Sequence, residues 1–357
     1  MKKTIKNKLI GKGSFGCIFK PNLECKSTNL KEYKKKNKTN KISKVIINNN
    51  TNEIDHEYMI NKLISKIPNH KDWTVLWDDK CEPLDYSLIK NTSEIKKCLQ
   101  KSTKSINEYN QYAQMLIGDY GGLPFKKYCE TIINKSTFTS YKNFTHTFIK
   151  LFKLLNNLFI GLFELQKINV VHQDLSINNI LIKDNKLYII DFGLSSKFKD
   201  DKFIYKRSKK QILGSRIYDP YPYEYVYMYA NNKERKKEIN KIKTKNYRNN
   251  HDDFLLIHKN IFNRNNIHKI MINNLIHKQL DKKSIIKKLD TYSLGMLILN
   301  IFCNFSYLYN IPKKKLLKCF KIIDIQNHIS LLKEMTEYNS NERIDIFTAY
   351  ERFKSLI

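Results

Sequence analysis

The sequence predicts an α+β fold in two parts, a smaller strand-rich part followed by a larger helical part. Short β-branched runs come early, whereas apolar residues at helical spacing dominate residues 144–168 and the chain from 290 onward. The 357 residues, 41% of them hydrophobic, can bury a full core and exclude general disorder. We expect an N-terminal lobe of residues 1–118 and a C-terminal lobe of residues 119–357.

The N-terminal part begins with two predicted strands in residues 5–20, joined by a glycine turn. A β-branched run at 42–47 predicts a further strand, and residues 52–67 have the apolar spacing of a helix. Two polar, lysine-rich stretches are expected to be a solvated insert and a surface excursion: 21–40 and 91–110.

The C-terminal part opens with the clearest amphipathic helix, residues 144–168. Two short apolar runs follow, 179–182 and 187–190, and Asp184-Asn185 between them is a hairpin signal. Residues 226–289 form a strongly basic insert with weak helical stretches around 234–243 and 266–286.

The stretch 291–311 contains no charged residue and has about the length that crosses a bilayer, roughly 20 residues. It also contains asparagine, serine and tyrosine residues, which favour a buried core helix followed by a loop. We therefore expect no transmembrane segment.

The formal charge of +31 raises the question of nucleic-acid binding. The chain has 58 Lys but only 7 Arg, with 40 Asn and 3 Ala. Lys and Asn have AT-rich codons, whereas Ala and most Arg codons are GC-rich. Because proteins that clamp phosphate or read bases favour arginine, this composition points to an AT-rich genome rather than to a nucleic-acid site.

The seven cysteines are odd in number and form no CxxC pair. This pattern argues against a disulfide framework or a structural zinc site, so we expect a reducing compartment. The N-terminus lacks the apolar core of a signal peptide. Both observations predict a cytoplasmic protein.

A first motif, Gly-Lys-Gly-Ser-Phe-Gly, occupies positions 11–16. A dinucleotide-binding glycine motif should open a helix and precede an acidic residue by about 20 positions. Here the β-prone Cys17-Ile18-Phe19 follows. This context favours a hairpin whose backbone closes over phosphates, with an ordinary glycine hairpin as the alternative.

A second motif, His-Gln-Asp-Leu-Ser-Ile-Asn-Asn, occupies positions 172–179, and Asp191-Phe192-Gly193 follows the predicted hairpin. Phosphoryl transfer requires a positioned γ-phosphate, neutralised charge and an oriented acceptor hydroxyl. Asp174 can accept the hydroxyl proton, and Asn179 and Asp191 offer the hard oxygen ligands that Mg²⁺ prefers. These residues in this order and spacing indicate phosphoryl transfer far more specifically than any one of them alone.

With these motifs in this order, residues 8–355 resemble the eukaryotic-type protein kinase superfamily. The resemblance implies a bilobal kinase fold that uses ATP with Mg²⁺, or with Mn²⁺ in its place, to phosphorylate protein hydroxyls. It makes Lys44 the lysine that holds the α- and β-phosphates. Glu57 becomes its partner on the following helix, with Glu53, one turn earlier, as the rival.

The resemblance also implies the residues that bind the nucleotide. The stretch 115–122 is similar to the hinge between lobes, whose backbone, around Asp119 and Tyr120, would hydrogen-bond adenine. Apolar side chains would sandwich the purine and the glycine motif would cover the phosphates: Ile10, Ile18 and Ile42, then Gly11, Gly13, Ser14, Phe15 and Gly16.

The stretch 214–224 resembles the end of a kinase activation segment. The resemblance places Ser215 where a threonine meets the catalytic aspartate in serine/threonine kinases, so we expect that hydroxyl specificity. Two long-range pairings are also implied: Asp290 with the backbone around His172, and Glu224 with Arg343.

Three features depart from the family pattern. Gln173 replaces the arginine that commonly receives an activation-loop phosphate, which argues against phospho-activation. Ser176 replaces the lysine that usually touches the γ-phosphate, as in small-molecule kinases and atypical Bud-type kinases. The basic insert 226–289 separates Glu224 from Asp290, where the family has only about a dozen residues.

Four short strings are similar to kinases of large cytoplasmic DNA viruses: Cys17-Ile18-Phe19-Lys20-Pro21, Ser43-Lys44, Ile67-Pro68-Asn69 and Cys81-Glu82-Pro83. Those genomes are often AT-rich, in agreement with the composition. This resemblance would place the protein in the host cytoplasm or the virion.

The sequence therefore predicts an ATP-dependent serine/threonine protein kinase that acts on protein substrates, with acidic substrates suited to its charge. One alternative is an atypical or small-molecule kinase. Another is a basic scaffold that binds nucleic acid or a virion through segments 21–40 and 226–289, by weak non-specific contacts with nucleic acid.

Overall fold

The computed structural model of the 357-residue chain divides into two compact units, Met1–Gly122 and Leu123–Ile357. The structure describes residues 7–13, 16–26, 40–49, 51–89, 92–200, 203–205, 208, 222–228, 256–264 and 281–357. The predicted helical stretch at 234–243 lies outside these ranges, as does most of the one at 266–286. A strand-rich first unit and a helical second unit confirm the α+β class.

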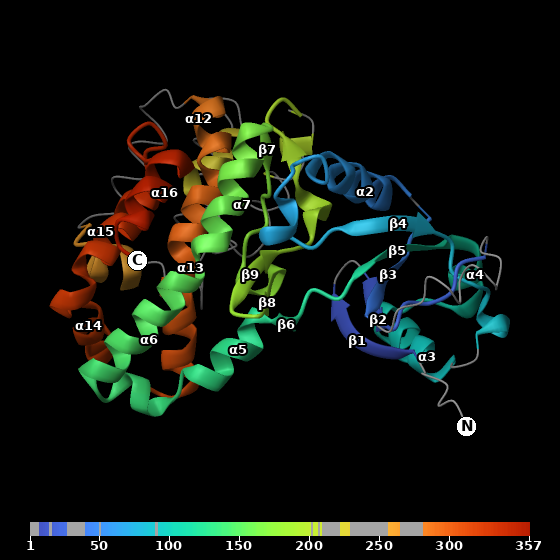
Figure 1. Ribbon diagram of the computed structural model, residues 1–357, viewed down its shortest axis with the longest axis horizontal. Coiled ribbons are helices and arrows are strands. Elements are labelled where there is room, and N and C mark those ends of the chain that lie inside the picture. The colour runs from blue at the N-terminus through green and yellow to red at the C-terminus, as the bar shows by residue number, and fades with distance from the viewer. Residues whose placement is uncertain are drawn as a thin grey trace. The chain divides into compact units, whose positions relative to one another are not determined.

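The first unit is built on one antiparallel sheet in the order β1-β2-β3-β5-β4 (Figure 1). Its strands are β1 (Lys8–Gly13), β2 (Gly16–Lys20), β3 (Lys41–Ile47), β4 (Trp77–Cys81) and β5 (Ala113–Asp119). Its helices are α2 (Asn52–Ile64), η1 (His70–Asp72), η2 (Tyr86–Leu88), α3 (Thr92–Ser102) and α4 (Ile106–Tyr112).

Helices cover both faces of this sheet. Side chains alternate along β3, so Val45 packs in one cluster with Ile95 of α3 and Tyr109 of α4, while Ile46 packs in another with Ile54 of α2. Because neither face is left to water, the five central residues of β3 are all buried. β3 is therefore the buried central strand of the sheet.

The stretch 91–110, expected to be a surface excursion, contributes to this core. α3 buries Ile95, Cys98 and Leu99 against β1 and β2, and α4 begins with a Ser105–Glu108 capping box. The few apolar residues of α3 fall on one helical face, so a polar composition concealed a packing helix.

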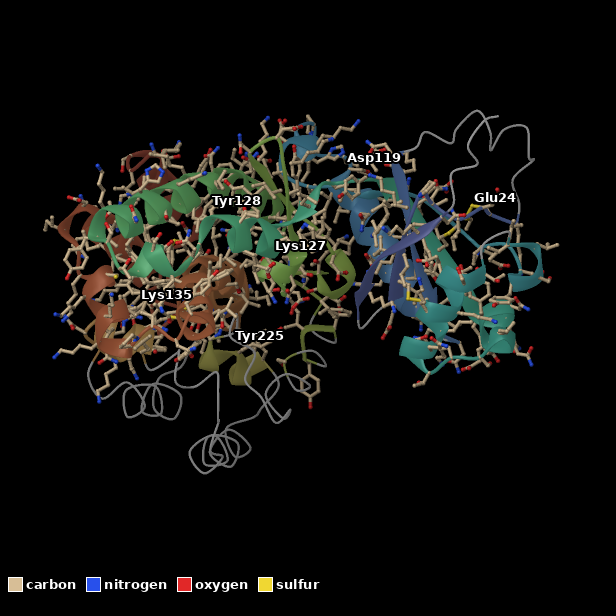
Figure 2. All side chains as sticks on the ribbon, turned by 90° about the horizontal axis from the view of Figure 1, so that it is seen from below. Glu24, Asp119, Lys127, Tyr128, Lys135 and Tyr225 are labelled. Carbon is tan, nitrogen blue, oxygen red and sulfur yellow. A yellow bond between two sulfur atoms is a disulfide. The ribbon has the colours of Figure 1, made fainter. Side chains whose placement is uncertain are left out.

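Two disulfides, Cys17–Cys98 and Cys25–Cys81, cross-link the first unit. Figure 2 shows sulfur–sulfur bonds in yellow, one of them next to Glu24. The expectation of no disulfides is therefore wrong. The paired cysteines are 81 and 56 residues apart in the sequence and meet only in the folded unit. The odd number of cysteines and the absence of CxxC pairs therefore could not reveal these bonds. The disulfides remove one of the two arguments for a cytoplasmic location, which stays a prediction.

The second unit is mainly helical. Its strands are short: β6 (Leu123–Pro124), β7 (Val170–Val171), β8 (Ile180–Lys183), β9 (Lys186–Ile189) and β10 (Ser196–Lys197). Its longer helices are α5 (Phe125–Ile132), α6 (Tyr141–Leu154), α7 (Asn156–Lys167), α12 (Lys282–Lys287), α13 (Leu289–Leu308), α14 (Lys313–Phe320), α15 (Gln326–Met335) and α16 (Ile346–Lys354). Its short helical segments are η3 (Lys135–Phe138), η4 (Ile177–Asn179), η5 (Phe192–Leu194), η6 (Tyr223–Met228), η7 (Leu256–Ile261) and η8 (Ile323–Ile325).

The long helix predicted at 144–168 is two helices, α6 and α7, which meet at Leu155. α7 packs beside α13 and α16 (Figure 1). The predicted hairpin is present as β8–β9, and Asp184 and Asn185 have the positive φ values, 50° and 57°, of a tight hairpin turn.

The uncharged stretch 291–311 forms most of α13, Leu289–Leu308. Among the described residues, α13 is the one helix long and apolar enough to span a membrane, and 78% of its apolar window is buried in the fold. A helix that is mostly covered by protein can be apolar nearly all round, so the sequence's interpretation of a core helix is confirmed.

Candidate active site

Lys44 and Glu57 form a buried ion pair within the first unit. Lys44 Nζ lies 3.0 Å from Oε1 and 2.8 Å from Oε2 of Glu57, and the two residues are only 5% and 2% exposed. Glu53, the rival partner, instead accepts a hydrogen bond from Asn48 Nδ2 at 3.5 Å. Strand alternation turns Lys44 toward α2, whose inner face carries Ile54 and Glu57 three residues apart.

The glycine motif lies at the β1–β2 turn, where Gly13 pairs with Gly16. Gly16 has a φ of +148°, and a Cβ there would lie 2.3 Å from the carbonyl oxygen of Val45. Only glycine therefore lets β2 approach β3 this closely. Ser14 and Phe15 lie outside the described residues.

The three isoleucines expected to hold the purine differ in exposure. Ile42 is buried, Ile18 is half-buried and Ile10 is 44% exposed. All three lie on strands of the first sheet, β3, β2 and β1 respectively. Gly11, opposite Ile18 in the β1–β2 register, lies beside them.

The stretch compared with a hinge ends β5. The Tyr120 N–H donates to the carbonyl of Asn40 at 2.8 Å, and the carboxylate of Asp119 (Figure 2) lies 2.9 Å from Lys41 Nζ. Lys20 Nζ lies 3.3 Å from the centre of the Tyr120 ring. These contacts fix the end of β5, and they occupy the Tyr120 N–H, one of the backbone groups in the stretch expected to hydrogen-bond adenine.

Asp174 and Asn179 are hydrogen-bonded to each other in the loop after β7. Asn179 Nδ2 donates to Asp174 Oδ2 at 2.7 Å and to the Asp174 carbonyl at 2.9 Å. The Ile190 N–H donates to the carbonyl of Asn179 at 3.0 Å, which brings Asp191 beside this loop. Three polar groups separated by up to 17 positions are thus gathered at one end of the β8–β9 hairpin.

Asp191 has left-handed backbone angles, φ 66° and ψ 69°. Aspartate tolerates this region better than most residues. The next residue, Phe192, is buried with its ring centre 5.0 Å from that of His172. The packed phenylalanine and the left-handed backbone of Asp191 together fix the course of the chain at this residue.

Asp290, at the start of α13, anchors the 172–174 backbone as expected. Its carboxylate accepts the N–H groups of His172 at 2.6 Å and Gln173 at 3.0 Å. Burial raises the pKa of Asp290 to about 6, although these two hydrogen bonds oppose the rise. The predicted brace is confirmed.

His172 is a buried, neutral imidazole. Its Nδ1 accepts the Asp174 N–H at 3.2 Å, so Nε2 carries the proton and donates to the Ile190 carbonyl at 3.1 Å. Burial lowers the pKa of His172 to about 4. His172 therefore links the loop of Asp174 to the strand that leads to Asp191.

This lowered pKa predicts a pH dependence of stability. Because the unfolded chain binds a proton near pH 6.5 and the folded chain only near pH 4, stability is lost as the pH falls through that window. Between pH 7 and pH 5, His172 should remove about 2 kcal/mol from the free energy of unfolding. Urea denaturation of the wild type and of His172→Leu at both pH values measures the difference. Equal pH dependence in the two proteins would contradict the prediction.

Gln173 contacts three other parts of the second unit. Its Nε2 donates to Ser196 Oγ at 2.7 Å and to the Leu194 carbonyl at 3.1 Å. Its Oε1 accepts the hydroxyl of Tyr225, a residue labelled in Figure 2. Gln173, Ser196 and Tyr225 are all buried, so a neutral network lies where the family resemblance puts an arginine.

Arg343 pairs with Glu224 in the second unit, and this expected pairing is confirmed. Arg343 Nη2 lies 2.6 Å from Glu224 Oε1, and both residues are buried. Arg343 Nε also donates to the Glu337 carbonyl at 2.7 Å. Ser215, the remaining expected catalytic residue, lies outside the described residues.

The described residues include no cluster of three or more His, Cys, Asp or Glu side chains able to hold a metal ion by themselves. Asn179 and Asp191 fit a different arrangement. Mg²⁺ is usually held by one or two protein oxygen ligands, with waters and substrate phosphates completing the shell. A carboxylate and a carboxamide brought together at one hairpin are compatible with that use.

Two polar groups near these residues escaped the sequence reasoning. Trp77 contacts Glu57 and Tyr225 contacts Gln173, at separations of 20 and 52 positions. Neither belongs to a motif, so no local signal distinguishes them from core aromatic residues. Only the sheet and the packing of the second unit bring them to their partners.

A sequence model of the family described as protein tyrosine and serine/threonine kinase matches residues 4–215. The match includes the glycine motif, Lys44, Glu57 and the loop that carries Asp174, Asn179 and Asp191. A search of curated proteins finds no significant match.

Proposed function

The chain belongs to the protein tyrosine and serine/threonine kinase family, and we propose that within it this protein transfers the γ-phosphate of Mg-ATP to serine and threonine hydroxyls of proteins. The observation that carries the proposal is the contact of Asn179 with Asp174, 2.7 Å, in a loop bonded to the residue before Asp191. The transfer needs an oriented hydroxyl and neutralised phosphate charge at the same place.

The proposed roles follow from the chemistry of each group. Asp174 orients the acceptor hydroxyl and accepts its proton. Asn179 and Asp191 hold Mg²⁺, which supplies positive charge to the phosphates when bound. The Asn179 amide hydrogen bond keeps the Asp174 carboxylate in one orientation.

In the first unit, Lys44 would bind the α- and β-phosphates. Glu57 contacts Nζ with both carboxylate oxygens, so the ammonium is held in one orientation in advance of the nucleotide. Pre-oriented charge stabilises the transferring group without reorganisation at the moment of reaction. The glycine backbone at Gly11, Gly13 and Gly16 would cover the phosphates.

The preference for serine and threonine rests on the sequence around Ser215, which resembles the segment of serine/threonine kinases. The test is transfer of radiolabelled γ-phosphate to a mixture of protein substrates, acidic ones included, followed by acid hydrolysis. Phosphoserine and phosphothreonine are the expected products. Phosphotyrosine alone would overturn the proposed specificity.

An atypical or small-molecule kinase is the second candidate, and one observation favours it. Ser176 stands where the family has a lysine, and its Oγ is buried without a hydrogen-bond partner among the described residues. Choline-like and aminoglycoside acceptors in the same assay test this candidate. Labelling of these small molecules without labelled protein would favour it over a protein kinase.

The viral origin suggested by the composition and by short strings remains a proposal. It is supported by the excess of lysine over arginine and by the strings at 67–69 and 81–83.

The physiological substrates call for a separate experiment. Phosphoproteomic comparison of cells expressing the wild type and Asp174→Asn would identify them.

A further inference from the structure

Trp77, the first residue of β4, contacts the Lys44–Glu57 pair. Its indole Nε1–H donates to Glu57 Oε1 at 2.8 Å, the oxygen that Lys44 Nζ approaches at 3.0 Å. Glu57 therefore accepts two different donors on one oxygen, while its other oxygen lies 2.8 Å from Lys44. One donor is a flexible ammonium and the other a rigid, neutral ring.

A second connection joins Trp77 to the next turn of α2. The Trp77 backbone N–H donates to Asn61 Oδ1 at 3.0 Å, and Asn61 Nδ2 donates to the carbonyl of Glu57 at 2.7 Å. Asn61 is buried, with an exposure of 2%. The helix that carries Glu57 is therefore bonded to β4 through two side chains one turn apart.

This connection adds to apolar packing of α2, which also buries Ile60 and Ile64. The cluster between α2 and the sheet consists of Ile54, Ile46 and Leu116, with the rings of Tyr58 and Trp77 beside them. A carboxylate buried to 2% exposure is costly unless its oxygens keep hydrogen bonds. The indole N–H supplies one such bond, and tryptophan loses little conformational entropy because it has only two side-chain torsions.

We propose that Trp77 is a positioning residue, which holds Glu57 toward Lys44 through its indole N–H and so presents Lys44 Nζ to the phosphates of ATP. The inference rests on the proposed function, in which Lys44 binds those phosphates. All the contacts that carry it lie within Met1–Gly122. The position of Glu57 is therefore set by the same sheet that carries Lys44.

The test replaces Trp77 by phenylalanine in the full-length protein, which keeps an aromatic ring beside Ile54 and removes the N–H. The dissociation constant of Mg-ATP, measured by direct titration, is expected to rise about tenfold, because a bond to a charged group is lost. The KM of the protein acceptor should stay within about twofold, since no acceptor role is assigned to Trp77. A purely structural role would lower the unfolding midpoint without this selective loss of nucleotide affinity.

The chain offers a matched control in Trp73. This residue is fully buried, and its Nε1 has no hydrogen-bond partner among the residues that the structure describes. Trp73→Phe removes the same N–H without breaking a bond, so Mg-ATP affinity should remain within about twofold of the wild type. An equal loss of affinity in both variants would overturn the proposal.

The control variant also provides a direct reporter. The chain has two tryptophans, so Trp73→Phe leaves Trp77 as the sole indole. Adding Glu57→Gln in this background replaces the charged acceptor and should change the Trp77 emission maximum. An unchanged spectrum would contradict the contact, and this readout holds even if Trp77→Phe does not fold.

The two proposals fail differently. If the wild type phosphorylates protein and Trp77→Phe binds Mg-ATP with unchanged affinity, the positioning role is wrong and the proposed function stands. If the wild type binds no Mg-ATP, the proposed function itself is wrong, whatever the tryptophan variants show.

Discussion

Replacing Asp191 by alanine is expected to reduce γ-phosphate transfer to background, a loss on the order of 1,000-fold. The substitution removes one of two proposed protein ligands of Mg²⁺, the other being Asn179, and the phosphate charge is then no longer balanced. Transfer of radiolabelled phosphate to a general protein substrate measures the effect.

The backbone of Asp191 makes a second variant necessary. Alanine is strained at a φ of 66°, whereas asparagine tolerates left-handed angles. Asp191→Asn keeps the shape of the side chain and removes only its charge, so it should lose activity with an unchanged unfolding midpoint. Asp324→Ala, which removes an exposed carboxylate in η8 of the same unit, is the control and should remain active. Undiminished transfer by folded Asp191→Asn would exclude the assigned role.

Replacing Arg343 by methionine should produce the largest loss of stability. The substitution leaves the Glu224 carboxylate buried without the guanidinium that lies 2.6 Å away, and it removes the hydrogen bond to the Glu337 carbonyl. Loss of one partner of a buried pair costs about 3–5 kcal/mol, because the remaining charge has no compensation. Urea denaturation of the two proteins at pH 8, above the pKa of about 7 of Glu224, measures this difference.

The pH dependence of the loss provides a check on its cause. Burial raises the pKa of Glu224 to about 7, against the attraction of Arg343, and removal of Arg343 should raise it further. A folded-state pKa above the unfolded value of about 4.5 means that the folded variant binds the extra proton, so its stability falls as the pH rises. The loss in unfolding free energy of Arg343→Met, relative to the wild type, should therefore be larger at pH 8 than at pH 5.

A double variant separates the unpaired charge from simple loss of packing. Arg343→Met with Glu224→Gln removes both charges, and much of the lost stability should return. If the double variant were no more stable than Arg343→Met, the unpaired carboxylate would not be the cause.

Much of the candidate site could be predicted because its residues are close in sequence. Asp174 and Asn179 lie in one loop, and the hairpin that leads to Asp191 has its turn signal at Asp184-Asn185. A short loop between fixed strands allows few arrangements, so residue spacing carries geometric information. The pairing of Lys44 with Glu57 was implied by the family resemblance, and helical spacing only favoured Glu57 over Glu53.

Elsewhere, sequence reasoning failed where composition was used to infer exposure. The lysine-rich stretch 91–110 packs Ile95 and Leu99 into the core, and Cys98 bonds Cys17. A helix needs only one apolar face to pack against a sheet, and three or four buried residues hardly alter its average composition. The disulfides were missed because pairing depends on distance in the fold.

The sequence by itself determined the α+β class and the chemical groups of the 172–179 and 191–193 motifs, because local spacing and hydrophobic period are properties of neighbouring residues. Only the tertiary structure decided which distant groups support them. Trp77 reaches Glu57 through the sheet order β1-β2-β3-β5-β4, and Tyr225 reaches Gln173 through packing in the second unit. Such contacts depend on strand order and helix packing, which residue spacing along the chain does not encode.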